Sequence, residues 1–269
     1  MDNEQLKRQV RDHWGADPCG SQTTAAERFS RRYYDEIEEF RYRTEPEIFS
    51  FAQFTRHHGQ KMLEVGVGAG SDFLQWVRAG TQAHGVDLTD EAVEHVQKRL
   101  AVYGLSAAEV RTADAEKLPY ADNSFDLVYS WGVIHHTPDT PRALAELVRV
   151  ARVGGTIKVM VYNRHSLFAV YRWLFSGLLR GRFKSLGWVI YHHQESIGTK
   201  AYTLRESRNM LLKLPVRIVR LQAPATYYDL LRDKPWYLRW PAALAACLWG
   251  MNRCGWYMTA EIVKTERRG

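Results

Sequence analysis

The chain has 269 residues, of which 45% are hydrophobic and 25% are charged, and its formal net charge is +7. This composition excludes a disordered or collagen-like chain and is typical of one large globular domain with additions. No run of about 20 apolar residues occurs, so we expect no membrane-spanning helix. The polar stretch Met1–Arg11 predicts no signal peptide, and three scattered cysteines predict reduced thiols in a cytoplasmic protein.

Residues 1–60 carry helical patterns and no strand pattern. Helices are expected over residues 2–13, 24–40 and 47–54. A loop rich in glycine and proline separates the first two, and residues 41–46 are expected to break the second because Pro46 cannot continue a helix. We therefore treat residues 1–60 as an N-terminal helical segment and residues 61–269 as the main domain.

The stretch from Lys61 to Leu74 organises the main domain. A short apolar run ends in Gly66, Gly68 and Gly70, and an amphipathic helix pattern begins at once, which predicts a strand, a tight turn and a helix N-terminus. Glycines let the backbone approach a ligand because no Cβ is in the way. The acid Glu64 before the turn suits a ligand that carries positive charge better than a pyrophosphate.

Further strand patterns alternate with helices. They lie at residues 81–88, 109–115, 124–131 and 153–161. The first two end in Asp87 and Asp114. Thr89 is expected to cap a helix to about Leu100, and Pro141 is well placed in the first turn of a helix over residues 140–151. This alternation predicts a doubly wound α/β sheet.

Beyond Val161 the pattern is looser. Residues 216–221 and 256–264 are expected to be the sixth and seventh strands. Thr203 and Glu206 have capping-box spacing at the start of a helix to about Lys213. The remaining segments, about 163–201 and 224–255, are expected to be insertions between these elements.

The stretch from Met62 to Val161 resembles the class I methyltransferases that use S-adenosylmethionine, in the subgroup that acts on small molecules. The matching pieces, in chain order, are LEVGVGAG, GVDLTDEAV, ADAEKLPYADNSFDLVYSWGVIHHTPD and ARVGGTIKVMVYN. Each piece alone is weak, but together they keep the family's order within one domain. The resemblance implies a Rossmann-like, seven-stranded methyltransferase sheet with helices on both faces, S-adenosyl-L-methionine as the cofactor, and an enzyme of small-molecule metabolism.

The resemblance also assigns residues to the methionine end of this cofactor. The glycine turn of the family wraps that end, which implies a role for Glu64, Gly66, Gly68 and Gly70. Ser130, at the end of the fourth strand, is expected to meet the methionine moiety.

The ribose and adenine contacts follow from the same resemblance. Asp87 would accept both ribose hydroxyls, since a carboxylate offers two acceptor oxygens, and Leu88 would pack on the adenine face. Asp114 would accept from the adenine amino group, and the Ala115 amide would reach a ring nitrogen. Alternatively, both acids are strand-end carboxylates that are satisfied by turn amides or cap the next helix.

In the resembling family, N-terminal helices close over the cofactor, which excludes water and orients the methyl group. Residues 1–60 would form this cover here, through Tyr33, Tyr34, Arg43 or the Trp14–Cys19 loop. The alternative is that these aromatic residues only dock the helices on the sheet.

Adjacent histidines occur at residues 57–58, 135–136 and 192–193. Neighbouring residues on a regular element point apart and no Cys or carboxylate spacing completes a site, so no metal is expected. His135 and His136 follow the fourth strand, where an imidazole could take a proton from a hydroxyl, thiol or amine. Alternatively, His136 satisfies backbone groups in the turn before Pro138. Further candidates for the acceptor side are Tyr34, Tyr162, His192 and Glu195, and the insertions at about 163–201 and 224–255 are expected to form this side.

Charge divides unevenly along the chain. Residues 1–164 hold 20 Lys and Arg against 24 Asp and Glu, whereas residues 165–269 hold 17 against 6. The fourth strand ends in a sequence unlike that of base-methylating enzymes, and no nucleic-acid-binding module occurs, so no nucleic acid is expected. The basic stretches with Trp and Tyr favour a membrane-surface contact, or else they form a solvated basic face.

The sequence therefore predicts an S-adenosylmethionine-dependent methyltransferase that acts by in-line displacement on a small acceptor, apolar or lipid-like in character. The alternatives are a nucleic-acid or protein methyltransferase that uses the basic C-terminal third, and a non-catalytic cofactor-binding partner subunit. Because a sulfonium is already a good leaving group, alignment and desolvation are the main contributions expected of the protein.

Overall fold

The computed structural model describes residues 2–16, 18, 20–176, 178–181, 183–196 and 198–266 of the chain. Within these residues, an eight-stranded sheet has the order β3-β2-β1-β4-β5-β8-β7, and the short strand β6 (Ala201–Tyr202) pairs with β5. The strands on this path are β1 (Lys61–Val65), β2 (Gln82–Asp87), β3 (Glu109–Thr112), β4 (Phe125–Trp131), β5 (Ala151–Asn163), β7 (Val216–Gln222) and β8 (Tyr257–Lys264). The seven predicted strands are confirmed; β6 is an addition, since two residues are too few to carry a strand pattern.

Strands β1 to β5 run parallel, and β8 is antiparallel to both β5 and β7. Successive side chains alternate between two cores, so that Met62 lies in one and Leu63 in the other. Helices α4 (Ser71–Arg78) and α5 (Asp90–Val102) cover the first face, and α6 (Thr140–Val150) and α9 (Leu204–Leu212) cover the second. The doubly wound arrangement expected from the sequence is confirmed, and it explains why β4 is almost continuously buried.

The predicted starts of three helices in the main domain are also found. The Thr89 side chain accepts the Ala92 N–H at the start of α5, and Asp139 accepts the Arg142 N–H at the start of α6, where Pro141 lies in the first turn. Both hydrogen bonds of the capping box between Thr203 and Glu206 are present in α9. Each cap satisfies backbone donors that the first helical turn leaves unpaired.

The N-terminal segment differs from the prediction in one helix. After α1 (Asn3–Ala16) and the 3-10 turn η1 (Ser21–Thr23), helix α2 runs from Arg31 to Thr44, whereas residues 24–40 were expected to be helical. Ser30 sets the start, because its side chain accepts the Tyr33 N–H, and the helix continues through the expected break until just before Pro46. Helix α3 (Glu47–Ala52) and the 3-10 turn η2 (Phe54–His57) then lead into β1.

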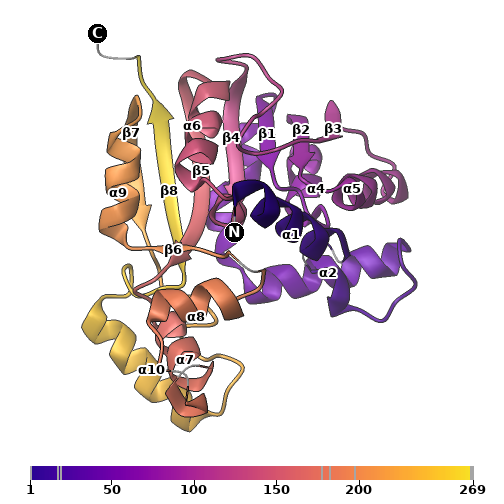
Figure 1. Ribbon diagram of the computed structural model, residues 1–269. Coiled ribbons are helices and arrows are strands. Elements are labelled where there is room, and N and C mark those ends of the chain that lie inside the picture. The colour runs from indigo at the N-terminus through magenta and orange to yellow at the C-terminus, as the bar shows by residue number, and fades with distance from the viewer. Residues whose placement is uncertain are drawn as a thin grey trace.

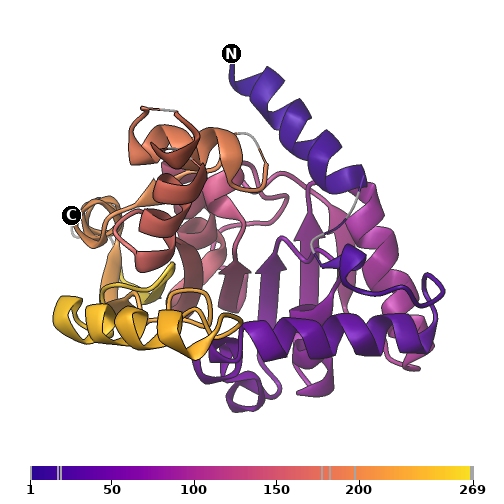
Figure 2. The same ribbon diagram turned by 90° about the horizontal axis from the view of Figure 1, so that it is seen from below.

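A group of helices, called here the helical lobe, lies beside the sheet. It consists of α7 (Leu167–Ser176), η4 (Leu178–Arg180), α8 (Leu186–His193) and α10 (Trp236–Trp249). Figure 1 shows the lobe near the end of the sheet where β8 begins, which is the carboxyl end of the parallel strands. Figure 2 shows α1, α2 and the lobe arranged around these strand ends. No helix in the described part of the chain is both long and apolar enough to cross a membrane.

A short 3-10 turn, η3 (Ile134–His136), completes the elements that surround the strand ends. It follows β4 directly and precedes α6, so its side chains are presented at the carboxyl edge of the sheet. This edge is where open α/β sheets bind ligands.

Candidate functional site

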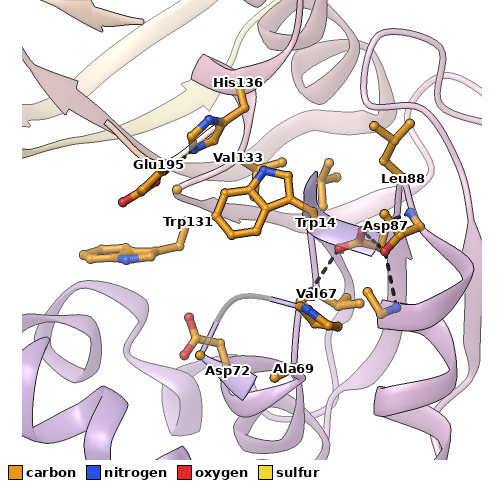
Figure 3. Close-up of a pocket in the computed structure, with 18 of the residues that line it drawn as sticks. Trp14, Val67, Ala69, Asp72, Asp87, Leu88, Trp131, Val133, His136 and Glu195 are labelled. Carbon is orange, nitrogen blue, oxygen red and sulfur yellow. Dashed lines mark hydrogen bonds and ion pairs between the residues drawn. The ribbon is translucent and has the colours of Figure 1, made fainter. Parts of the chain in front are cut away.

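A cavity of about 780 Å³ lies at the carboxyl ends of β1, β2 and β4. Its walls come from α1, the turn after β1, the strand ends, η3 and the helical lobe. Figure 3 shows side chains from these elements around a common space, with Asp87 and Leu88 on one side and Trp131, His136 and Glu195 on the other. The volume falls in the range of ordinary small-molecule sites.

The glycine turn forms one wall of this cavity. Gly66, Gly68 and Gly70 all line it and all have positive φ, at 85°, 50° and 78°. A Cβ built on Gly66 would lie 2.1 Å from Val133 Cγ2, so the turn needs glycine both for its backbone conformation and for its contact with the segment after β4. The sequence prediction of a close backbone approach at this turn agrees with this geometry.

A buried arginine holds the turn in place. Arg99 of α5 has no exposed surface, and its Nη1 donates to the Ala69 carbonyl and to Ser71 Oγ, both at 2.9 Å. Its Nη2 donates to the Tyr34 carbonyl at 3.2 Å and to Glu38 at 2.9 Å. Arg99 therefore ties the glycine turn to α2. The sequence pattern does not reveal this role, because an arginine on a helix is usually solvated.

Asp87 ends β2 and lines the cavity. Its Oδ2 accepts the Gly68 N–H at 3.0 Å, and its Oδ1 accepts the Thr89 N–H and the Thr89 hydroxyl, each at 3.1 Å. Burial raises the pKa of the Asp87 carboxyl, and these donors oppose that shift. Asp87 thus has the position expected for a ribose contact while also making the turn bonds of the alternative interpretation.

Asp72 and Glu64, two further acids beside the glycine turn, differ in their hydrogen bonding. Asp72 accepts two hydrogen bonds from Arg41, at 2.9 and 2.8 Å, and one from Tyr129 at 2.9 Å. Glu64 also lines the cavity, but its Oε2 is buried without a hydrogen-bond partner among the described residues. Burial, and then the nearby Asp72, hold the pKa of Glu64 well above its usual range. An unpaired buried acceptor beside an apolar space fits a cationic or hydrogen-bond-donating ligand group.

Leu88, Asp114 and Ala115 also line the cavity, and they follow the neighbouring strands β2 and β3. Asp114 is already engaged: its Oδ2 accepts from Lys7 Nζ at 2.7 Å, and its Oδ1 accepts the Glu116 N–H at 2.9 Å. Lys7 belongs to α1, so this helix is fastened over the third strand end. The tie gives α1 the place predicted for an N-terminal cover.

Ser130 departs from its expected role. It is fully buried and is not among the residues that line the cavity, whereas its neighbours Trp131 and Gly132 do line it. Adjacent residues of a strand point to opposite faces, which explains why Trp131 rather than Ser130 reaches the space. The Trp131 indole donates to Glu45 of the N-terminal segment at 2.7 Å.

The structure separates the two candidate histidines. His135 is fully buried and does not line the cavity, and neither of its ring nitrogens has a hydrogen-bond partner among the described residues. Burial, and then His136, hold the pKa of His135 well below its usual range. Its ring packs on Tyr162, with 4.0 Å between centroids, so His135 is a packing residue and does not reach an acceptor.

His136 lines the cavity and bridges two segments. Its Nδ1 lies 3.0 Å from Ser196 Oγ and 3.1 Å from Thr199 Oγ1, and its Nε2 lies 3.4 Å from Glu195 Oε2. Trp14 of α1 packs edge-on against the ring at 5.5 Å. These contacts fix the orientation of the imidazole, which is the arrangement that a general base requires.

Tyr162 and Glu195 meet His136 at the same place. The Tyr162 hydroxyl donates to the Glu195 carboxylate, 2.7 and 2.8 Å from its two oxygens, and both residues line the cavity. Burial raises the pKa of the Glu195 carboxyl, but the bonds from His136 and Tyr162 outweigh it and leave this pKa lowered. The two acceptor-side candidates are thus brought together with His136, although they come from distant parts of the chain.

Other candidates lie elsewhere. Tyr34 is fully buried and donates to the His95 carbonyl at 3.0 Å, and it does not line the cavity, so its placement on the acceptor side is wrong. His192 is exposed and stacks on Trp188 away from the cavity, so it too is wrongly placed. Both side chains face neighbouring helical residues, which the sequence pattern does not reveal.

Of the residues expected to cover the cofactor, some line the cavity and others do not. Trp14 lines the cavity, while Tyr33 and Arg43 do not; Tyr33 is buried against α5 and Arg43 is exposed on α2. Of the Trp14–Cys19 loop, Asp17 and Cys19 lie outside the described residues. Trp14 thus lies at the cavity, where a cover would act, whereas Tyr33 packs in the cluster between α2 and α5.

An aromatic wall of the cavity was not predicted. Tyr162 stacks on Trp256 with 4.2 Å between centroids, and Phe168 packs on Trp256 at 5.1 Å. Tyr228 and Tyr257 complete this wall, which is built from the end of β5, the start of α7, the segment before α10 and the start of β8. Within the described part of the chain, no group of three or more His, Cys, Asp or Glu side chains could hold a metal ion.

Residues 63–159 match a family model described as a methyltransferase domain. The match begins in β1 and ends in β5, so it includes the glycine turn, Asp87, Asp114 and His136. This part of the chain is similar to a methyltransferase domain. The resemblance drawn from the sequence motifs is therefore confirmed over the stretch that carries them.

Curated relatives share this methyltransferase domain. A protein of Mycobacterium bovis, described as uncharacterized, is 37% identical over 110 residues, which are 41% of this chain and 40% of the relative. The phthiotriol/phenolphthiotriol dimycocerosates methyltransferase of Mycobacterium leprae is 39% identical over 99 residues, which are 36% of each chain. The matched part is thus less than half the length of either relative.

Solved structures cover more of the chain at lower identity. A chain from the complex of the Haloferax volcanii Trm112 methyltransferase activator with a methyltransferase has a TM-score of 0.65 and 17% identity, and the match covers 97% of this chain and 99% of that one. Geranyl diphosphate C-methyltransferase from Streptomyces coelicolor, solved with S-adenosyl-L-homocysteine, has a TM-score of 0.64 and 15% identity over 97% and 98%. At such identities the likeness shows the fold.

Proposed function

We propose that the protein is an S-adenosylmethionine-dependent methyltransferase that acts on a small, apolar or lipid-like acceptor. The observation that carries this proposal is the single cavity that joins the glycine turn and Asp87 to an aromatic wall and an oriented imidazole. A methyl transfer needs a cofactor pocket and an acceptor pocket that meet at one point, and in-line displacement demands that they be aligned.

The residues of the first part of the cavity fit this cofactor. The unpaired Oε2 of buried Glu64 suits a cationic group, and the Gly66–Gly70 turn leaves room for close approach of the methionine end. Asp87 would hold the ribose hydroxyls, and Leu88, Asp114 and Ala115 would surround the adenine. When bound, the cofactor would supply the methyl group of its sulfonium, and the sulfur would be left as a neutral thioether.

The second part of the cavity supports an apolar acceptor. Trp131, Tyr162, Phe168, Trp256 and Tyr257 give it a wall of aromatic rings, which favours an apolar molecule over a highly charged one. The same rings keep water away from the reacting atoms.

His136 would accept a proton from the acceptor. Its Nδ1 is held by Ser196 and Thr199, so its Nε2 faces Glu195 and the cavity. Glu195, fixed by Tyr162, would stabilise the imidazolium that forms. A hydroxyl, thiol or amine acceptor needs this step when it loses a proton on methylation.

Calorimetry with Asp87→Ala tests the cofactor assignment. We expect binding of S-adenosylmethionine to be lost, because the variant removes the ribose acceptor and also frees the Gly68 and Thr89 amides. Asp90→Ala is the matched control: it removes an exposed acid three residues along the chain that does not line the cavity, and it should bind normally. Unchanged affinity in Asp87→Ala would show that this cofactor does not bind at this site.

The acceptor is identified by turnover. The protein is incubated with methyl-labelled S-adenosylmethionine and separate polar and lipid extracts, and labelled products are identified by mass spectrometry. We expect label in the apolar extract and none in added RNA or protein. Cofactor binding without transfer to any extract would leave the non-catalytic alternative in place of the proposed reaction.

A further inference from the structure

Helix α10 has the opposite burial pattern to that of an ordinary core helix. Its buried residues are the small Ala242 and Ala246, while most of its large apolar side chains are exposed. Ala246 packs beside Leu167 of α7 and Cys254, so the helix rests on the lobe through its alanine side. A helix that only completed a core would turn its large apolar residues inward.

Four of the exposed apolar residues of α10 form a stripe. Trp236, Trp240, Leu244 and Leu248 are four residues apart, and their exposed fractions are 70%, 72%, 62% and 82%. Side chains at this spacing share one side of a helix. A contiguous apolar stripe of this kind marks a surface that contacts something else, and tryptophan is favoured where one end is apolar and the other is wet.

Basic residues flank the stripe. Arg232 and Lys234 precede α10, Arg239 lies within it, and Arg253 follows it; all four are exposed. The acid in this segment, Asp233, is paired with Lys234 at 2.6 Å. Two copies of this face would bring like charges together, which disfavours self-association through it.

A second cavity, of about 400 Å³, adjoins the end of α10. It is lined by Asn163, His165, Thr203, Leu204, Arg205, Trp249 and Arg253, and no acid lines it. Among the described residues, no carboxylate lies within ion-pair distance of Arg205 or Arg253. The planar guanidinium group pairs well with the oxygens of a phosphate.

We propose that α10 docks on the surface of an anionic lipid bilayer. The stripe from Trp236 to Leu248 enters the boundary between headgroups and acyl chains, and the basic flanks face anionic headgroups. The cavity with Arg205 and Arg253 receives the phosphate of one lipid headgroup. Apolar area and positive charge on one element are the two features that bind peripheral proteins to such a surface.

Docking in this way would bring the aromatic wall of the main cavity close to the lipid. The segment that carries α10 leaves the wall of the main cavity at Tyr228 and returns to it at Trp256. Buried Asp229 fastens this segment by accepting the N–H groups of Phe168 and Trp256, at 3.0 and 2.8 Å. Docking itself does not depend on methyl transfer, so it is tested without any activity measurement.

Vesicle sedimentation of the full chain tests the stripe. Vesicles of phosphatidylcholine alone are compared with vesicles of phosphatidylcholine and phosphatidylglycerol, and we expect the protein to sediment with the second kind. Trp236→Ser/Trp240→Ser should weaken this binding by about ten-fold or more, because it removes two interfacial rings. Thermal unfolding of each variant verifies that the fold is kept.

Pairs of matched variants, one on the proposed docking face and one elsewhere, serve as controls. Leu248→Ser on α10 should weaken vesicle binding, whereas Leu212→Ser on α9, also an exposed leucine, should not. Arg205→Ala/Arg253→Ala should reduce the preference for anionic vesicles, whereas Arg217→Ala/Arg220→Ala on the exposed side of β7 should change it less. Equal losses in the paired variants would overturn the assignment of the face.

Two further results would also overturn the proposal. The first is wild-type protein that stays in the supernatant with both kinds of vesicle. The second is a wild-type dimer that ignores vesicles and becomes a monomer in Trp236→Ser/Trp240→Ser, which would make a second copy of the chain the occupant of the stripe.

Discussion

The two ends of the main cavity are built in different ways. The end with the glycine turn is made by consecutive pieces of chain, β1 with α4 and β2 with α5, and Asp87 bonds to Gly68 and Thr89 within the same local structure. The other end joins His136 to Trp14 and Glu195, which lie far from it in the sequence. The first end is therefore encoded by short motifs, whereas the second depends on how whole elements pack.

Gly66→Ala changes the end of the cavity that short motifs encode, and we expect it to cause the largest loss of stability. The positive φ costs about 1–2 kcal/mol for a residue with a Cβ, and overlap with Val133 adds about 1–3 kcal/mol. We expect the free energy of unfolding, measured with urea, to fall by about 2–5 kcal/mol, and S-adenosylmethionine affinity to fall with it.

Gly59→Ala is the control for this prediction. Gly59 also has a positive φ, 75°, but a Cβ there would meet nothing within 4 Å. Its loss of stability should be limited to the backbone cost of about 1–2 kcal/mol. Equal losses at the two positions would show that the contact with Val133 is not what requires glycine in the turn.

His136→Ala probes the other end of the cavity. We expect kcat for a protic acceptor to fall about 10²-fold, while the Kd for S-adenosylmethionine stays unchanged, because the imidazole serves the acceptor and not the cofactor. Single-turnover kinetics and calorimetry measure the two quantities. His135→Phe, which keeps a ring on Tyr162, should retain turnover; a loss as large as that of His136→Ala would contradict the separation of the two histidines.

Lys158 lies on β5 and does not line the cavity. Its Nζ donates to the Phe51 carbonyl at 2.6 Å, and burial lowers its pKa to about 8. Between pH 8 and about 10.4 the unfolded chain binds more protons at this lysine than the folded one, so stability should rise with pH by at most about 1.4 kcal/mol per unit. Urea unfolding across this window should show the rise.

The matching variants isolate the contribution of this lysine. Lys158→Met removes the titrating group, so the rise attributable to it should disappear, whereas Lys213→Met on the surface should leave the profile as it is in the wild type. A profile that keeps its slope in Lys158→Met would assign the rise to another group whose pKa is lowered by burial, such as Lys200.

The contrast between the two ends also explains what the sequence could reveal. The strands from β1 to β5 and the caps at Thr89 and Thr203 follow from periodicity and short-range hydrogen bonds, and all were predicted. The start of α2 was misplaced because Thr24 and Ser30 are both plausible caps, and only the packing of the helix on α5 favours the second.

Some residues of the candidate site could be predicted from the sequence and others could not. The residues expected to contact the cofactor lie at or just after strand ends, and all of them except Ser130 line the cavity. Strand alternation would have indicated Trp131 in place of Ser130. Arg99 and Asp72 were missed because their roles depend on distant partners such as Glu38 and Arg41. Glu195 and Tyr162 were named separately, and no sequence pattern predicts that they bond to each other.

Before any ligand arrives, the Asp87 carboxylate already has one orientation, since Gly68 and Thr89 hold it from both of its oxygens. The rotational freedom of this side chain is therefore lost during folding and not during association. A diol that binds here meets an acceptor that needs no rearrangement, so its on-rate should be limited by access past α1 and not by a search among rotamers.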